Sequence, residues 1–187
     1  MFGKQRKSAL SHIQRNAEGK WEYTGYLCSY TGSVPRRTAL MLLWLWAGIG
    51  TVPLLISGFL PVPGMTGYWY TLPPYIAGLV AAVSTLWSLC QLTMGKDPIR
   101  EYILNTVKTW LPVRAVFTVV FAGLAFIGET VYLCLHGFGS HAAAAVLHLV
   151  FMLAALVCFL IVHRLFGKLA WIRIENAGSE KDPAEET

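Results

Sequence analysis

Four long apolar stretches constrain this chain more than any other feature of its sequence. A helix that crosses a hydrocarbon core of about 30 Å needs about 20 apolar residues, because each residue adds about 1.5 Å. The stretches at 38–60, 72–92, 111–135 and 142–166 all reach this length. With 55% hydrophobic and only 13% charged residues, the chain has too few polar groups to cover a soluble globule. The sequence therefore predicts an all-α integral membrane protein, a four-transmembrane-helix bundle over residues 38–170.

The basic residues predict the orientation of these spans. Lys and Arg occur before the first span, between the second and third, and after the fourth, whereas the loops 61–71 and 136–141 contain no charged residue. Because cytoplasmic loops carry the excess of Lys and Arg, both termini are expected in the cytoplasm and the protein in the plasma membrane. Arg114, one turn into the third span, is expected to extend toward the inner headgroups. The net charge of +5 thus reflects topology, and no nucleic-acid partner is expected.

Polar segments flank the spans on the predicted cytoplasmic side. Within residues 1–37, an interfacial helix or a frayed terminus is expected near residues 2–17, followed by a short hairpin around the Y-T-G sequences at Tyr23 and Tyr30. Asp97 and Pro98 predict the start of a short amphipathic helix on the inner surface, before the third span. Residues 171–187 are polar and without periodicity, so they are predicted to be a disordered tail.

Glu129 is the only acidic residue within a predicted span. An ionised carboxylate in hydrocarbon is unfavourable, so such a residue is expected to face protein, water or a partner charge. The centre of the outer turn lies between Phe138 and Gly139, with Glu129 nine to ten residues before it and His148 as far after it. In two antiparallel helices these residues should lie at nearly equal depth. Small residues at helical spacing around both predict that the third and fourth spans pack through these faces.

Three hypotheses concern this intramembrane polar pair. The first is a structural hydrogen bond between Glu129 and His148, with Tyr132 as a further partner and His136 and His141 at the mouth of the interface. The second is proton coupling, because a buried carboxyl group beside an imidazole is able to titrate near neutral pH. The third is a metal or haem site built from the same glutamate and the three histidines. No dense ligand motif supports the third hypothesis, so neither a metal nor another cofactor is expected.

A second polar group lies in the second span, toward the cytoplasm. Ser84, Ser88 and Gln91 fall on one face of this helix. They are expected to hold neighbouring helices together, because polar side chains commonly bond across helix interfaces in membranes. The alternative is that they line an inner cavity that continues from Glu129.

Motifs for catalysis are absent from the sequence. There is no phosphate-binding Gly loop, no Ser/His/Asp arrangement and no C-x-x-C, so an enzyme is not expected and a thiol oxidoreductase is excluded. The few intramembrane polar groups and the aromatic N-terminal segment predict an accessory or assembly subunit of a larger membrane complex, in contact with lipid and with another membrane protein or a second copy. The alternative is a homo-oligomeric, proton-coupled small transporter or channel that uses Glu129 and His148.

Overall fold

In the computed structural model, the four apolar stretches form four long helices. They are α2 (Arg36–Ser57), α4 (Leu72–Met94), α5 (Glu101–His136) and α6 (Ala142–Gly167). The structure describes residues 13–15, 21–23, 25–62, 64–65, 68–95, 97–137 and 141–174. Each of the four helices is long and apolar enough to cross a membrane, so the prediction of a four-helix bundle is confirmed at this level.

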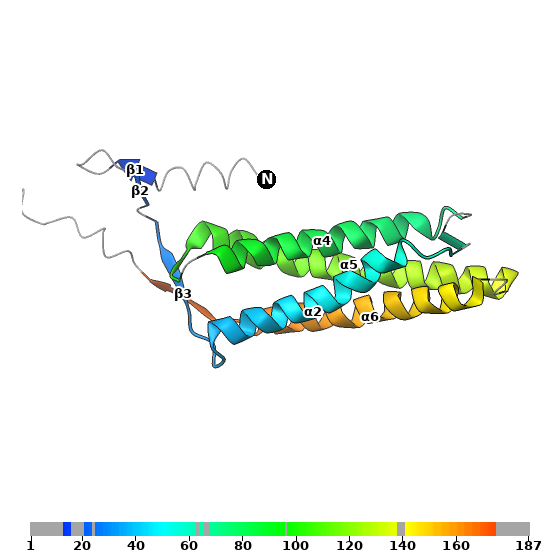
Figure 1. Cartoon of the computed structure of the whole chain (residues 1–187). Helices are drawn as coiled ribbons and strands as arrows, with labels where there is room; N and C mark the ends of the chain where they lie inside the picture. The colour runs from blue at the N-terminus through cyan, green and yellow to red at the C-terminus, as the bar shows by residue number, and fades with distance from the viewer. Residues whose placement is uncertain are drawn as a thin grey trace, which may run out of the picture.

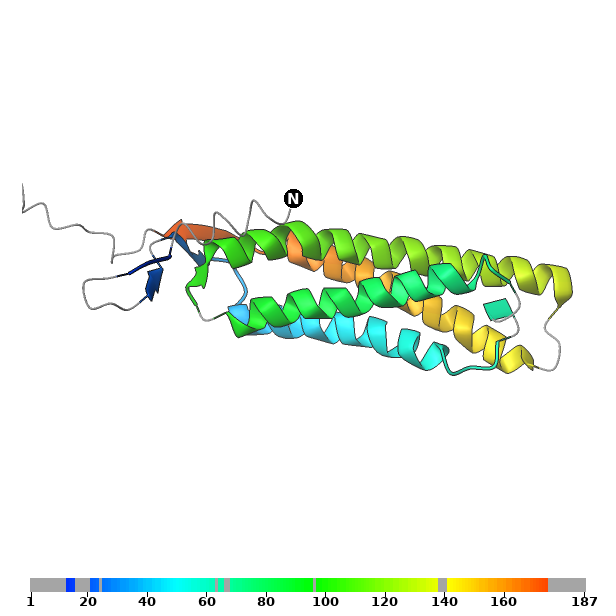
Figure 2. The same ribbon diagram turned by 90° about the horizontal axis from the view of Figure 1, so that it is seen from above.

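The helices pack side by side in an up-and-down bundle (Figures 1 and 2). Helix α2 packs against α4 and α6, and α5 packs against the same two helices from the other side. The order around the bundle is therefore α2, α4, α5 and α6, with each helix antiparallel to the next. Short connections favour this arrangement, because consecutive helices then become neighbours.

Helix α5 is longer than the sequence predicts. It runs without interruption for 36 residues, with Pro112 inside it, and so measures about 54 Å at 1.5 Å per residue. The prediction of a separate surface helix starting near Asp97 is wrong, because that segment leads into strand β4 (Ile99–Arg100) and the helix begins at Glu101. The two expected helices merge because they share one buried face. Its positions continue at helical spacing across the expected boundary: Leu104, Val107, Leu111 and Ala115.

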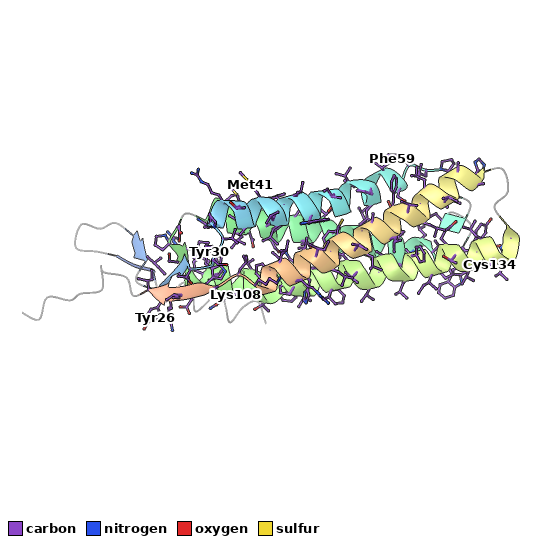
Figure 3. All side chains as sticks on the ribbon, turned by 90° about the horizontal axis from the view of Figure 1, so that it is seen from below. Tyr26, Tyr30, Met41, Phe59, Lys108 and Cys134 are labelled. Atoms are coloured by element: carbon purple, nitrogen blue, oxygen red, sulfur yellow. The ribbon has the colours of Figure 1, made fainter. Side chains whose placement is uncertain are left out.

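A three-stranded antiparallel sheet closes one end of the bundle, called here the sheet end (Figure 1). The central strand is β3 (Leu27–Tyr30), which pairs with β4 on one side and with β5 (Trp171–Ile174) on the other. The three strands come from the segments before α2, between α4 and α5, and after α6. A separate pair, β1 (Ile13–Arg15) and β2 (Trp21–Tyr23), precedes them. The opposite end, with the other two helix connections, is called the loop end; Figure 3 labels Tyr26 and Tyr30 at the sheet end and Phe59 and Cys134 near the loop end.

Two predictions about the flanking segments are corrected by these strands. The tail predicted to be disordered begins with a strand at Trp171–Ile174, because β3 offers an unpaired edge and the Trp171 ring packs on Tyr30 with centroids 5.2 Å apart. The two Y-T-G segments do not pair with each other, since β2 pairs with β1 and β3 with β4 and β5. Residues 13–15, near the end of the predicted interfacial helix, form strand β1. Most of that helix, and the tail beyond residue 174, lie outside the described residues.

The interior consists of two apolar clusters that follow one another along the bundle. The cluster at the sheet end joins Cys28 of β3 and Ile99 of β4 to residues from all four helices. The cluster nearer the loop end contains Phe159 and also Val62 and Met65, which belong to the connection between α2 and α4. This connection therefore folds back into the bundle and forms part of its core.

Candidate functional site

Glu129 and His148 are both completely buried, with 0% of each side chain exposed. Glu129 lies seven residues before the last residue of α5, and His148 lies six residues after the first residue of α6. The two residues therefore occupy neighbouring helices in one layer of the bundle, near the loop end.

The predicted hydrogen bond between these two residues is not formed. Instead, His148 Nδ1 and Ser57 Oγ form a short hydrogen bond that joins α6 to α2. Both carboxyl oxygens of Glu129 and Nε2 of His148 have no hydrogen-bond partner among the described residues. Ser57 could not be found from the α5–α6 hairpin alone, because α2 reaches α6 only through the closure of the bundle.

The Glu129 carboxyl group faces the connection between α2 and α4. A Cβ atom added to Gly64 in this connection would lie only 2.2 Å from Oε2 of Glu129. An added Cβ on Gly128 would lie 3.2 Å from the Tyr70 carbonyl oxygen and 3.4 Å from Thr71 Oγ1. The two glycines therefore allow the connection to approach α5 closely. Thr71 is also fully buried, and its hydroxyl has no partner within the described part of the chain.

Tyr75 completes this layer from α4. Its hydroxyl donates a hydrogen bond to the Leu54 carbonyl oxygen at 2.7 Å, and its ring centroid lies 6.0 Å from that of His148. Nothing in the sequence singled out this tyrosine among the aromatic residues of the outer loop. Each helix thus contributes one polar side chain to what we call the buried polar layer: Ser57, Tyr75, Glu129 and His148.

The predicted supporting residues lie outside the buried polar layer. His136 and Tyr132 stack with ring centroids 4.8 Å apart, and the Tyr68 hydroxyl and His136 Nε2 form a hydrogen bond of 2.8 Å. His136 and His141 are exposed. Tyr68, Tyr132 and His136 form an aromatic cluster near the loop end. Across the described ranges, no group of three or more His, Cys, Asp or Glu side chains is arranged to hold a metal ion.

Arg114 forms a second polar group with two serines predicted from the sequence. Its Nη1 donates hydrogen bonds to the Ser84 carbonyl oxygen at 2.9 Å and to Ser88 Oγ at 2.5 Å. Ser84 lies ten residues before the last residue of α4, Met94, so this carbonyl is about 15 Å from that end of the helix. Ser88 lies six residues before Met94, so the guanidinium group joins α5 to two successive turns of α4.

The serines thus join α4 to α5, whereas Gln91 takes no part in these bonds. Gln91 lines an open surface groove with Met94 and Tyr102. Ser84 and Ser88 therefore form a contact between helices. Apolar residues of the second cluster lie between the two polar groups, among them Ala82, Ala125 and Met152.

The two polar groups differ in their chemistry. The buried polar layer contains an acid, an imidazole and two hydroxyl groups, all closed off from solvent beneath the connection between α2 and α4. The Arg114 group carries a permanent positive charge at a partly exposed position. No protein-family model, curated protein or solved structure matches this chain.

Proposed function

We propose that this protein is a small multi-pass membrane protein, with both termini in the cytoplasm, that acts as an accessory or assembly subunit of a larger membrane complex. The observation that carries this proposal is the exposed aliphatic surface at the sheet end, beyond the ends of the helices. Ile172 and Ile174 of β5 are 57% and 45% exposed. Exposed apolar side chains that lipid does not cover are typical of protein interaction sites.

The distribution of charge supports the cytoplasmic position of the sheet. Arg36, Lys108, Lys168 and Arg173 all lie at or near the sheet end, and Figure 3 labels Lys108 there. The connections at the loop end contain no Lys, Arg, Asp or Glu. The rule that cytoplasmic segments carry the basic residues therefore assigns the sheet end to the cytoplasm.

The register of the sheet gives it two different faces. Side chains alternate along a strand, so Cys28 and Trp171 face the bundle and belong to its core or pack on it. Leu27 pairs with Ile174, and Ser29 pairs with Ile172, so these residues share the opposite face. We call this the outer face of the sheet; it carries the aliphatic Leu27, Ile172 and Ile174 together with Ser29 and, through its pairing with Leu27, Arg100. In addition, β5 is an edge strand among the described strands, and such an edge is able to accept a further strand from a partner.

The test is gentle purification from native membranes, with the mass and composition of the purified particle as readout. We expect the wild-type protein to be recovered with a different membrane protein at a fixed ratio. The double substitution Ile172→Ser and Ile174→Ser should release that partner while the helical content stays unchanged. Ser29→Ala is the matched control, because it changes the same face without removing an aliphatic side chain. Recovery of the wild-type protein alone, as a monomer or a defined homo-oligomer, would refute the accessory role.

A second candidate is a homo-oligomeric, proton-coupled transporter or channel. The observation that favours it is that part of the buried polar layer has no hydrogen-bond partner. Buried polar atoms are normally hydrogen-bonded, but both carboxyl oxygens of Glu129 and the Nε2 atom of His148 have no partner among the described residues. It ranks second because apolar side chains separate this layer from the sheet end. Proton flux into vesicles containing the purified protein tests it. Flux that disappears in a folded Glu129→Gln variant would place this candidate first, and an unchanged flux would remove it.

A further inference from the structure

We propose that a cavity between α2 and α6 at the sheet end binds one anionic phospholipid. The phosphate group of this lipid lies against Lys168, and part of an acyl chain enters the cavity. The inference rests on the proposed membrane position of the four helices and does not depend on the accessory role.

The cavity has a volume of about 150 Å³ and lies between the segment that precedes α2, α2 itself and the end of α6. An apolar cavity of this size takes a group about as large as benzene, and thus several carbon atoms of an acyl chain. Ala39 on its wall is buried, whereas Leu42 is 37% exposed. The cavity therefore extends from the surface of the bundle toward its interior, so that a chain is able to enter from the surrounding lipid.

The lining of the cavity is polar at one end and apolar at the other. Its polar residues, Tyr30, Ser33 and Lys168, all lie beyond the ends of the two helices. The lining residues within the helices are all apolar: Ala39, Leu42, Leu43 and Leu165. Leu42 lies six residues after the first residue of α2, about 9 Å deeper along the helix axis. A phospholipid of the leaflet at the sheet end has the same order, with its phosphate group where the spans end and its chains inside.

The charge at the polar end favours an anionic lipid. Lys168 directly follows the last residue of α6 and is exposed, so it lies at the level where this span ends. Its ammonium group has three N–H donors and no acceptor, which suits a phosphate group. The described lining residues include no Asp or Glu that would repel such a group. Lys and Arg next to the end of a span attract the anionic lipids of the cytoplasmic leaflet.

The polar end of the cavity is held in place by contacts between segments that are distant in sequence. The backbone N–H of Thr31 donates a hydrogen bond to the Ala170 carbonyl oxygen at 3.1 Å, which joins the segment before α2 to the segment after α6. The Tyr30 ring packs against Trp171 in the same region. A site whose walls are already ordered loses little conformational freedom on binding. These contacts therefore favour a lipid that stays bound over one that only passes along the surface.

Native mass spectrometry of the full-length protein in detergent measures the binding. The probes are phosphatidylglycerol and phosphatidylcholine with identical acyl chains. We expect the wild-type protein to bind one phosphatidylglycerol about fivefold more tightly than phosphatidylcholine, the effect of one lysine beside an anionic lipid. Lys168→Gln should abolish this preference, whereas Lys108→Gln removes the same charge on α5, away from the cavity, and should preserve it. Equal binding of the two lipids to the wild-type protein would overturn the inference.

A filled cavity separates binding inside it from attraction to a surface charge. Ala39→Leu places a larger side chain in the cavity and leaves Lys168 unchanged. We expect it to weaken phosphatidylglycerol binding at least as much as Lys168→Gln does. Circular dichroism and thermal melting show whether each variant is folded, and a folded Ala39→Leu protein that binds like wild type would contradict the site. If Ala39→Leu does not fold, the exposed Lys168 still decides, because its substitution leaves the core intact.

Photocrosslinking locates the lipid and identifies the source of the phosphate group. Phosphatidylglycerol with a photoreactive acyl chain should label the peptides that contain Leu42 or Leu165, and an excess of inorganic phosphate should not displace it. Displacement by phosphate, or labelling confined to other parts of the helices, would overturn the inference. A wild-type protein that purifies alone from native membranes refutes the accessory role and leaves the lipid site standing, whereas equal binding of the two lipids removes the lipid site and leaves the accessory role.

Discussion

Two glycines in α2, only two residues apart, should respond in opposite ways to the same substitution. Gly50 faces α6 at a close contact, where an added Cβ would lie 2.9 Å from Phe159 Cε2 and 3.0 Å from Cys158 Cβ. An added Cβ at Gly48 meets no atom within 4 Å. Ordinary carbon contacts begin near 3.4 Å, so Gly50→Ala requires α2 and α6 to separate by a few tenths of an ångström, and Gly48→Ala requires no movement.

The expected magnitudes follow from two opposing contributions. Alanine favours a helix over glycine by about 0.8–1.0 kcal/mol, and this gain applies at both positions. Overpacking in a close-packed interior costs about 1–3 kcal/mol and applies only at Gly50. Gly48→Ala should therefore raise the free energy of unfolding slightly, and Gly50→Ala should lower it by up to about 2 kcal/mol. The difference between the two variants, about 1–3 kcal/mol, isolates the packing contribution.

The free energy of unfolding is measured in bicelles by denaturant titration, with tryptophan fluorescence as the signal. Phe159→Leu in the Gly50→Ala background serves as a second test, because removing the aromatic ring should recover part of the lost stability. If Gly48→Ala and Gly50→Ala change stability equally, the close contact between α2 and α6 is not the reason for glycine at position 50.

Three further predictions concern two buried groups at opposite ends of the bundle. Ser57→Ala should lower the free energy of unfolding by about 1–3 kcal/mol, because it leaves the buried Nδ1 atom of His148 without its partner. Ser57→Thr keeps the hydroxyl group and should retain most of the stability. Equal stability of the wild-type protein and Ser57→Ala would show that this hydrogen bond contributes nothing. At the sheet end, burial and then the negative charge of Glu101 raise the pKa of the Cys28 thiol above its ordinary value of 9.0. Cys28 should thus react with maleimide at mildly alkaline pH far more slowly than the exposed Cys134, and similar labelling rates would contradict this. A raised pKa means that the folded state favours the neutral thiol. The contribution of Cys28 to stability is therefore present below pH 9.0 and is lost as the pH rises through the pKa of the folded state. The melting temperature of Cys28→Ala should thus fall less above pH 9.0 than that of the wild-type protein, and equal falls would refute this reasoning.

The helices were predictable because each one leaves a long and unambiguous pattern in the sequence. The start of α4 at Leu72 and of α6 at Ala142 agree with the predicted spans. The burial of Glu129 was expected from the sequence, because an ionised carboxylate is unfavourable in hydrocarbon and so faces protein, water or a partner charge. These patterns lie within short stretches of the sequence, so a single sequence is sufficient to predict the helices.

The contacts that join distant segments could not be predicted in the same way. Strands of two to four residues carry too little periodicity to reveal that β3 pairs with β4 and β5. The partner of His148 depends on how α2 closes the bundle, and the hydrogen bonds of Arg114 depend on acceptors in α4. Likewise, the reason for a glycine at position 64 is its close approach to the Glu129 carboxyl group, which only the folded structure reveals. Each of these features arises from packing between segments and not from the pattern within one of them.

The pairing of β3 has a consequence for how the molecule is made. This strand leaves the ribosome before any of the four helices, yet one of its neighbours, β5, follows the last of them. The edge of β3 that binds β5 therefore stays unpaired until all four helices have been synthesised. The sheet is therefore completed only after the last of the four helices has been made. A chain interrupted before Trp171 would keep that edge exposed and available for pairing with another chain.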